Sequence, residues 1–86
     1  MPDRQTGITT RQMLDAPLNS IYVWPNGYLT YPKGLAFALG RLDLRIESSG
    51  WLRPENTCGL RETVVVDHAC HLDLYQLEAL RPCRRA

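Results

Sequence analysis

The 86-residue sequence lacks several features that mark particular classes of protein. No apolar run approaches the roughly 20 residues of a membrane-spanning helix, and residues 1–17 have no signal-peptide core. Ten basic residues nearly balance nine acidic ones, which excludes a polybasic nucleic-acid binder. We therefore expect one small domain in the cytoplasm.

Cysteine is scarce as well. Cys58, Cys70 and Cys83 are odd in number and sparse, unlike the dense, even-numbered cysteines of secreted disulfide scaffolds. His68 and His71 crowd around Cys70 too closely for the paired spacing of zinc ligands. A Cys/His nucleophilic site needs a spatial geometry that adjacency along the chain does not supply. We expect reduced thiols, no metal and no cofactor.

Strand and helix patterns alternate along the remainder of the chain. β-branched, aromatic or alternating segments predict strands at residues 20–24, 42–47 and 63–66. Capping residues and apolar stripes predict helices at residues 11–15, 32–39 and 74–81. Asp73 and Gln76 form a capping-box pattern before the last helix. Residues 53–59 have the composition of a loop.

This order of elements predicts an α/β fold with a small, mainly parallel, three-stranded sheet and two or three short helices, because the strand–helix connections require crossovers. We expect a flexible arm at residues 1–8, a single α/β domain at 9–81 and a basic tail at 82–86. Helices on one face only would leave the other sheet face open, as a surface for a partner or for a second copy.

A strand that ends in an acidic residue is the sharpest motif. Residues 64–67 read Val-Val-Val-Asp and resemble the Walker B element of P-loop ATPases and helicases, in which the carboxylate binds magnesium beside the nucleotide. The chain has no GxxxxGK[ST] loop to hold phosphates. His68 stands where that family usually has a catalytic carboxylate. The resemblance implies a degenerate core fragment without enzymatic activity.

Aromatic and arginine side chains supply the candidate binding residues, because exposed Tyr, Trp and Arg are typical interface anchors. We select Tyr28, Tyr31, Trp51 and Arg53. In size and style the chain is similar to accessory proteins of phages and prophages, including inhibitors of host defence. The sequence therefore predicts a non-enzymatic module that binds and modulates a larger host protein in the host cytoplasm, with homodimerisation as a further association.

The alternative is a nucleotide- or nucleic-acid-binding remnant. Open α/β sheets bind ligands at the carboxyl ends of their strands, so its loops would contribute Asn26, Gly27, Asp67 and His68. The balanced charge argues against nucleic acid as a partner, and the missing phosphate loop argues against a nucleotide.

Overall fold

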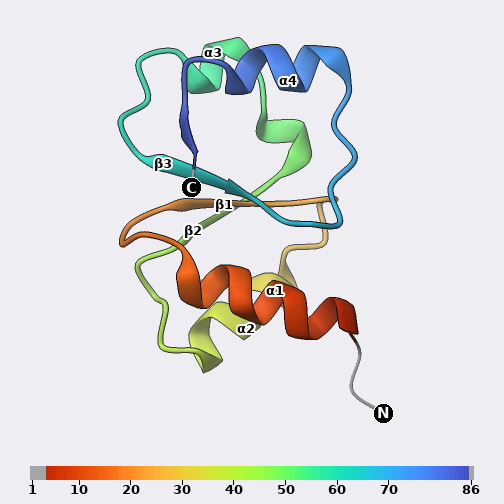
Figure 1. Ribbon diagram of the computed structural model, residues 1–86, viewed down its shortest axis with the longest axis vertical. Helices are drawn as coiled ribbons and strands as arrows, with labels where there is room; N and C mark the ends of the chain where they lie inside the picture. The colour runs from red at the N-terminus through yellow and green to blue at the C-terminus, as the bar shows by residue number, and fades with distance from the viewer. Residues whose placement is uncertain (1–3, 86) are drawn as a thin grey trace.

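A parallel four-stranded sheet forms the centre of the protein in the computed structural model, which describes residues 4–85 (Figure 1). The strand order is β2-β1-β3-β4. The strands are β1 (Ile21–Trp24), β2 (Arg45–Ser48), β3 (Thr63–Val66) and β4 (Arg84–Arg85), and every neighbouring pair is parallel. The expected small α/β fold with a parallel sheet is confirmed, whereas the expected number of strands was one too few.

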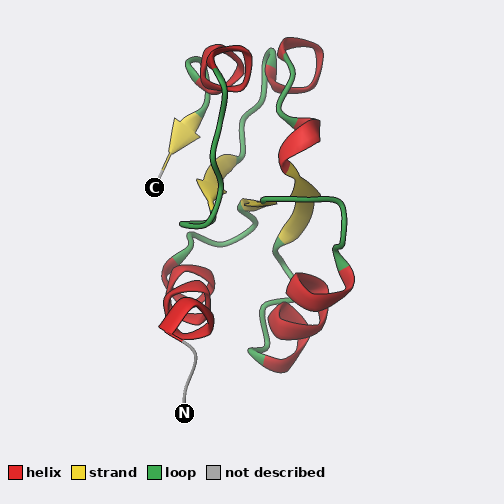
Figure 2. Ribbon diagram, turned by 90° about the vertical axis from the view of Figure 1, so that its right-hand side faces the viewer, coloured by secondary structure: helices red, strands yellow, loops and turns green. Residues whose placement is uncertain are grey.

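Helices cover both faces of this sheet (Figure 2). One layer holds α1 (Arg4–Asp15) and α2 (Thr30–Ala38), and the other holds α3 (Pro54–Thr57) and α4 (Leu74–Leu80). A short 3-10 helix, η1 (Ser49–Trp51), leads from β2 toward α3. The expectation that one face of the sheet is open is therefore wrong. The expectation of a loop over residues 53–59 is also wrong, because part of this segment forms α3.

The central strands are apolar throughout because both of their faces are buried. Side chains alternate between the two faces of a strand, and Ile21 and Val23 of β1 join the core under α3 and α4. Tyr22 and Trp24 instead join the core against α1 and α2. A strand buried on both faces must read as a continuous apolar run, which explains why the sequence predicts β3 at the observed residues.

The two ends of the chain are more ordered than expected. Helix α1 begins at Arg4, so residues 4–8 are helical rather than an arm, while residues 1–3 lie outside the described part. In this helix Thr9 and Met13 lie one turn apart and are both buried. The expected basic tail contains β4, because the buried Cys83 holds it beside β3 and Arg84 aligns with Thr63.

Local signals place the remaining elements well. The capping box of α4 is confirmed, since Gln76 donates its backbone N–H to Asp73 Oδ1 at 2.8 Å and accepts the Asp73 N–H at 3.0 Å. Gly40 has φ of 72° after α2, a left-handed conformation that glycine adopts without strain. The alternating pattern at residues 42–47 favours a strand with one face in solvent or an edge strand, and β2 is an edge strand, although it starts at Arg45 rather than near residue 42.

Candidate functional site

The order of the strands defines a switch point at the carboxyl edge of the sheet. From β1 the chain passes through α2 to β2 on one side, whereas β3 lies on the other side of β1. The loops after β1 and β3 therefore leave the same edge, on the right in Figure 1, and Asp67 N–H donates to Val23 O at 3.0 Å between them. Such switch points are where open α/β sheets bind ligands, and this edge holds the loops of Asn26, Gly27, Asp67 and His68.

Asp67, the acidic residue of the Walker B-like segment, is enclosed by its own chain. Its side chain is 0% exposed. Oδ1 accepts hydrogen bonds from Tyr22 Oη at 2.5 Å and from Thr9 Oγ1 at 3.0 Å, and Oδ2 accepts the Ala69 N–H at 3.0 Å. Burial, together with this hydrogen bond, raises the pKa of Tyr22 well above its ordinary value, so the phenol remains a donor. The carboxylate thus joins α1, β1 and the loop after β3.

Helix α1 also contacts the end of β3, through hydrogen bonds made by the side chain of Gln12. Gln12 Nε2 donates to Val66 O at 3.1 Å, and Gln12 Oε1 accepts the backbone N–H of His68 at 2.8 Å. The imidazole of His68 lies with Nδ1 3.5 Å from Asp67 Oδ2. The two hydrogen bonds of Gln12 join residues more than 50 positions apart in the sequence, so no local pattern could have revealed them.

The loop after β1 has a fixed shape and presents aromatic side chains outward. Asn26 Oδ1 accepts the Tyr28 N–H at 2.9 Å, and Ser49 Oγ donates to Pro25 O at 3.0 Å. Tyr28 is 83% exposed and Tyr31, at the start of α2, is 49% exposed. The Tyr31 ring lies 5.6 Å from that of Trp24 on β1, centroid to centroid.

Trp51 and Arg53 lie apart from these tyrosines. The half-buried Trp51 packs against the core beneath α3 and α4, whereas Trp24, which carries Tyr31, belongs to the core of the opposite face. The guanidinium of Arg45 covers the Trp51 ring at 5.4 Å. Arg53 is exposed and donates through Nε to Gly50 O at 3.2 Å. Tyr31 and Trp51 therefore lie against opposite faces of the sheet.

The cysteines are dispersed. Cys58 is exposed, Cys70 is half-buried and Cys83 is buried. Across residues 4–85, no three His, Cys, Asp or Glu side chains converge as a metal site requires. Burial and the Asp67 carboxylate raise the pKa of Cys70 to about 11, so at neutral pH this thiol is protonated and weakly nucleophilic.

The thiols should accordingly differ in their reaction with iodoacetamide at pH 7.5. We expect Cys58 to be alkylated first, the half-buried Cys70 more slowly, and the buried Cys83 only as fast as the domain opens, because burial raises the pKa of the latter two thiols. Peptide mass spectrometry over time measures the order. Cys70 reacting faster than Cys58 would contradict the protonated, shielded thiol and reopen the nucleophile hypothesis.

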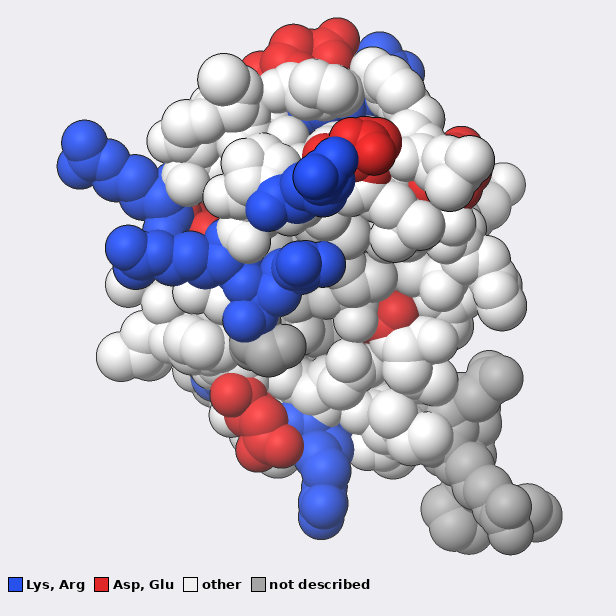
Figure 3. Space-filling model, turned by 45° about the horizontal axis from the view of Figure 1, so that its top comes forward, with Lys and Arg blue, Asp and Glu red and all other residues white. Residues whose placement is uncertain are grey.

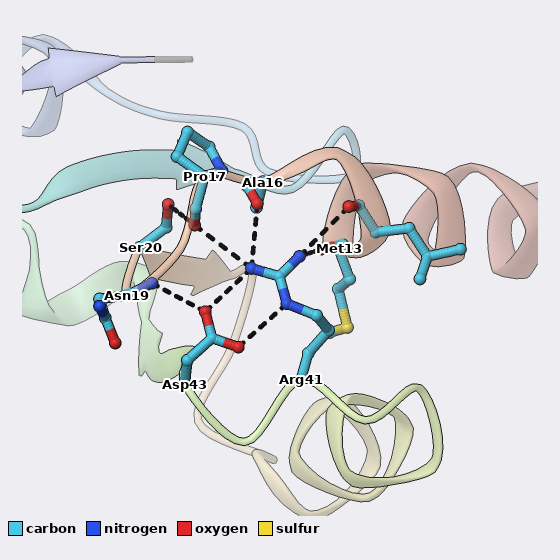
Figure 4. Close-up of polar contacts among 8 residues, drawn as sticks. Met13, Ala16, Pro17, Asn19, Ser20, Arg41 and Asp43 are labelled. Atoms are coloured by element: carbon cyan, nitrogen blue, oxygen red, sulfur yellow. Dashed lines mark hydrogen bonds and ion pairs between the residues drawn. The ribbon is translucent and has the colours of Figure 1, made fainter.

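The most extensive polar cluster outside this edge centres on Arg41 (Figure 4). Its terminal nitrogens donate to main-chain carbonyls at and just after the end of α1, those of Met13 (2.5 Å), Leu14 (3.2 Å), Ala16 (2.9 Å) and Pro17 (3.3 Å). Its guanidinium also binds both oxygens of Asp43 at 3.0 Å. An unpaired helix terminus needs such partners, and sequence reasoning missed this role because only the fold brings Arg41 to α1.

Asp43 completes the cluster by fixing the turn after α1. Its Oδ2 accepts the Asn19 N–H at 2.7 Å, and Asn19 has a left-handed φ of 62°. The hydrogen bonds from Arg41 hold the pKa of Asp43 well below its usual range. Arg41 and Arg45 are therefore both engaged by their own chain, through Asp43 and through Glu47 (2.6 Å) respectively.

Compared with models of protein families, with curated proteins and with solved structures, the chain matches none of them. Within residues 4–85, none of the helices is long and apolar enough to cross a membrane.

Proposed function

We propose that the protein is a non-enzymatic binding module that docks on a larger protein through the aromatic loop, defined as Trp24, Tyr28 and Tyr31. The observation that carries the proposal is the exposure of Tyr28, 83%, on a loop whose backbone is already fixed by hydrogen bonds. An exposed tyrosine in a fixed conformation loses little entropy on binding, which is why such residues serve as interface anchors.

The neighbouring ring strengthens this surface. Trp24 is half-buried in the core and supports Tyr31 from below at 5.6 Å, so the second tyrosine also has a restricted position. Ser49 joins the loop to the start of η1 through Pro25. Two tyrosines therefore project from a rigid support at the switch point of the sheet, where binding sites of this fold class are formed.

We favour protein docking over the nucleotide alternative because of the state of Asp67. A magnesium-binding carboxylate needs an oxygen that faces the ligand, whereas both oxygens of Asp67 accept hydrogen bonds within the chain and its side chain is 0% exposed. The sequence also has no phosphate loop. A role as a phage or prophage accessory protein, acting on a host protein in the cytoplasm, is the form of this proposal that suits its small size.

The test is affinity capture from cell extract with the double variant Tyr28→Ala/Tyr31→Ala. We expect the wild-type protein to retain one defined protein in stoichiometric amount, and the double variant to retain at least about tenfold less, since anchor residues commonly contribute 1–2 kcal/mol or more each. Quantitative mass spectrometry of the eluates measures the ratio.

Tyr75→Ala is the matched control, because Tyr75 is 54% exposed on α4, in the helical layer opposite that of α2. It should capture the partner as the wild type does, and thermal melts should show that all variants are folded. Equal capture by the double variant would refute the aromatic loop as the docking surface. Recovery of nucleic acid or nucleotide in place of a protein would support the alternative.

A further inference from the structure

Strand β2 forms an open edge of the sheet. It stands at the end of the strand order, and no strand among residues 4–85 pairs with its outer side. The Arg45 N–H donates to Ser20 O at 3.0 Å, toward β1. Because main-chain groups point alternately to the two sides of a strand, the N–H and C=O of Ile46 point outward. Such unpaired main-chain groups are a template for another strand.

The side chains of β2 carry opposite charges on one face of the sheet. Arg45 and Glu47 lie two residues apart and therefore share a face, where they form an ion pair at 2.6 Å. In an antiparallel pairing of two β2 strands centred on Ile46, the Arg45 of each copy lies directly opposite the Glu47 of the other. Opposite charges in directly opposed positions stabilise a strand pair, and like charges destabilise it. The charge pattern of β2 is thus complementary to itself.

The same register satisfies the outward main-chain groups. Ile46 of one copy meets Ile46 of the other as a hydrogen-bonded pair, in which each N–H donates to the opposite C=O. Arg45 and Glu47 then occupy the non-hydrogen-bonded pairs, in which the opposed side chains are closest. The arrangement has two-fold symmetry, so each of these contacts occurs twice.

An apolar depression lies beside this strand, on the face that α2 covers. It measures about 210 Å³, and its lining includes Leu44, Ile46 and Phe37, the last of which is 71% exposed on α2. A two-fold axis perpendicular to the sheet keeps the α2 helix of the second copy on the same face. Apolar surface therefore accompanies the charge pairs across the interface.

The other edge of the sheet lacks this complementarity. Strand β4 consists of Arg84 and Arg85 alone, so any pairing of two β4 strands brings arginine opposite arginine. Basic side chains gather around β4 and the start of β3 (Figure 3), where Arg61, Arg84 and Arg85 are exposed and form no ion pair within residues 4–85. The charges thus favour β2 over β4 as the edge that meets a second copy.

We propose that the protein forms a two-fold homodimer in which the β2 strands of two copies pair antiparallel, centred on Ile46, and join the two four-stranded sheets into one. The opposed positions of Arg45 and Glu47 set the register of this pairing. The inference does not rest on the proposed function, because the substitutions that test it leave the aromatic loop unchanged.

Sedimentation equilibrium across micromolar to submillimolar protein tests the proposal. The mass should rise with concentration from 9.8 kDa toward twice that value. Arg45→Glu and Glu47→Arg should each weaken the dimer at least about tenfold, because each brings like charges into both opposed pairs. An equimolar mixture of the two variants should form a heterodimer about as tight as the wild-type dimer, because every opposed pair then joins a basic and an acidic side chain.

The double exchange Arg45→Glu/Glu47→Arg should also restore the dimer, since it reverses both charges and keeps their pattern. It carries the test should thermal melting show that a single variant fails to fold. Arg81→Glu is the matched control, because Arg81 belongs to an exposed ion pair, with Glu78 at the end of α4. This variant should dimerise as the wild type does.

A wild-type protein that stays monomeric at every concentration would overturn the proposal and leave the β2 edge to an extended segment of another protein. A mixture of the two single variants that dimerises no better than each alone would also overturn it, because the charge register would then not join the copies. Loss of the dimer in Arg81→Glu would place the interface on another surface.

Discussion

Replacing Asp67 by alanine should lower the free energy of unfolding by about 4 kcal/mol, because two buried hydroxyls and a main-chain N–H lose their acceptor together and each unsatisfied buried donor costs about 1–3 kcal/mol. These donors belong to Tyr22, Thr9 and Ala69. Urea denaturation of the two proteins, followed by circular dichroism, measures the difference. The loss is large for a domain of this size, whose total stability is about 5–15 kcal/mol.

Asp67→Asn separates the shape of this side chain from its charge. Its amide oxygen can still accept from Tyr22 and Thr9, but its NH₂ group faces the N–H of Ala69, so we expect a loss of about 2 kcal/mol. Asp15→Asn, on the exposed surface of α1, should change stability by less than about 0.5 kcal/mol. Wild-type stability in Asp67→Ala would contradict the structural role. A melting shift with magnesium and nucleotide that Asp67→Asn abolishes would instead establish a nucleotide site.

The elements that the sequence predicts well are those with a local cause. Strand β3 is apolar because both of its faces are covered, and α4 begins at a capping box formed by neighbours three residues apart. The left-handed Gly40 likewise ends α2 through its own backbone. In each case the residues that determine the structure lie within a few positions of it.

The elements that it misses depend on distant parts of the chain. Nothing in the pair Arg84–Arg85 resembles a strand, and β4 forms because Cys83 is buried against the core and brings the backbone beside β3. Helix α3 was missed because it is a single short turn at Pro54–Thr57 whose sequence reads as a loop. Composition alone cannot show which polar segment will pack against a sheet.

The candidate site likewise has features that follow from the sequence pattern and features that depend on distant residues. Strand order alone brings the loops of Asn26 and Asp67 to one edge, and this could be argued from the sequence pattern. The occupation of both Asp67 oxygens could not, because Thr9 lies 58 residues away. The same carboxylate that resembles a magnesium ligand in the sequence is, in the fold, the link between the first helix and the central strands.

Arg41 is the second position where a large effect is expected. Arg41→Ala removes the donors for four carbonyls at and just after the end of α1 and the partner of Asp43, and we expect a loss of about 2–3 kcal/mol in the free energy of unfolding. Arg41→Lys should lose most of that amount, because a single ammonium cannot reproduce the planar fork. Arg45→Ala is the control, since its side chain is 54% exposed and surface pairs contribute little.

The dependence of stability on pH tests whether Asp43 is the ionic partner of Arg41. Its pKa is lower in the folded protein than in the unfolded chain, so its contribution is complete above about pH 4 and is lost as the pH falls through the folded-state pKa. Wild-type stability should therefore fall more steeply below about pH 4 than that of Arg41→Ala, in which the pKa of Asp43 returns toward its ordinary value. Parallel pH profiles for the two proteins, or an Arg41→Ala variant as stable as Arg45→Ala, would show that this cluster does not secure the end of α1.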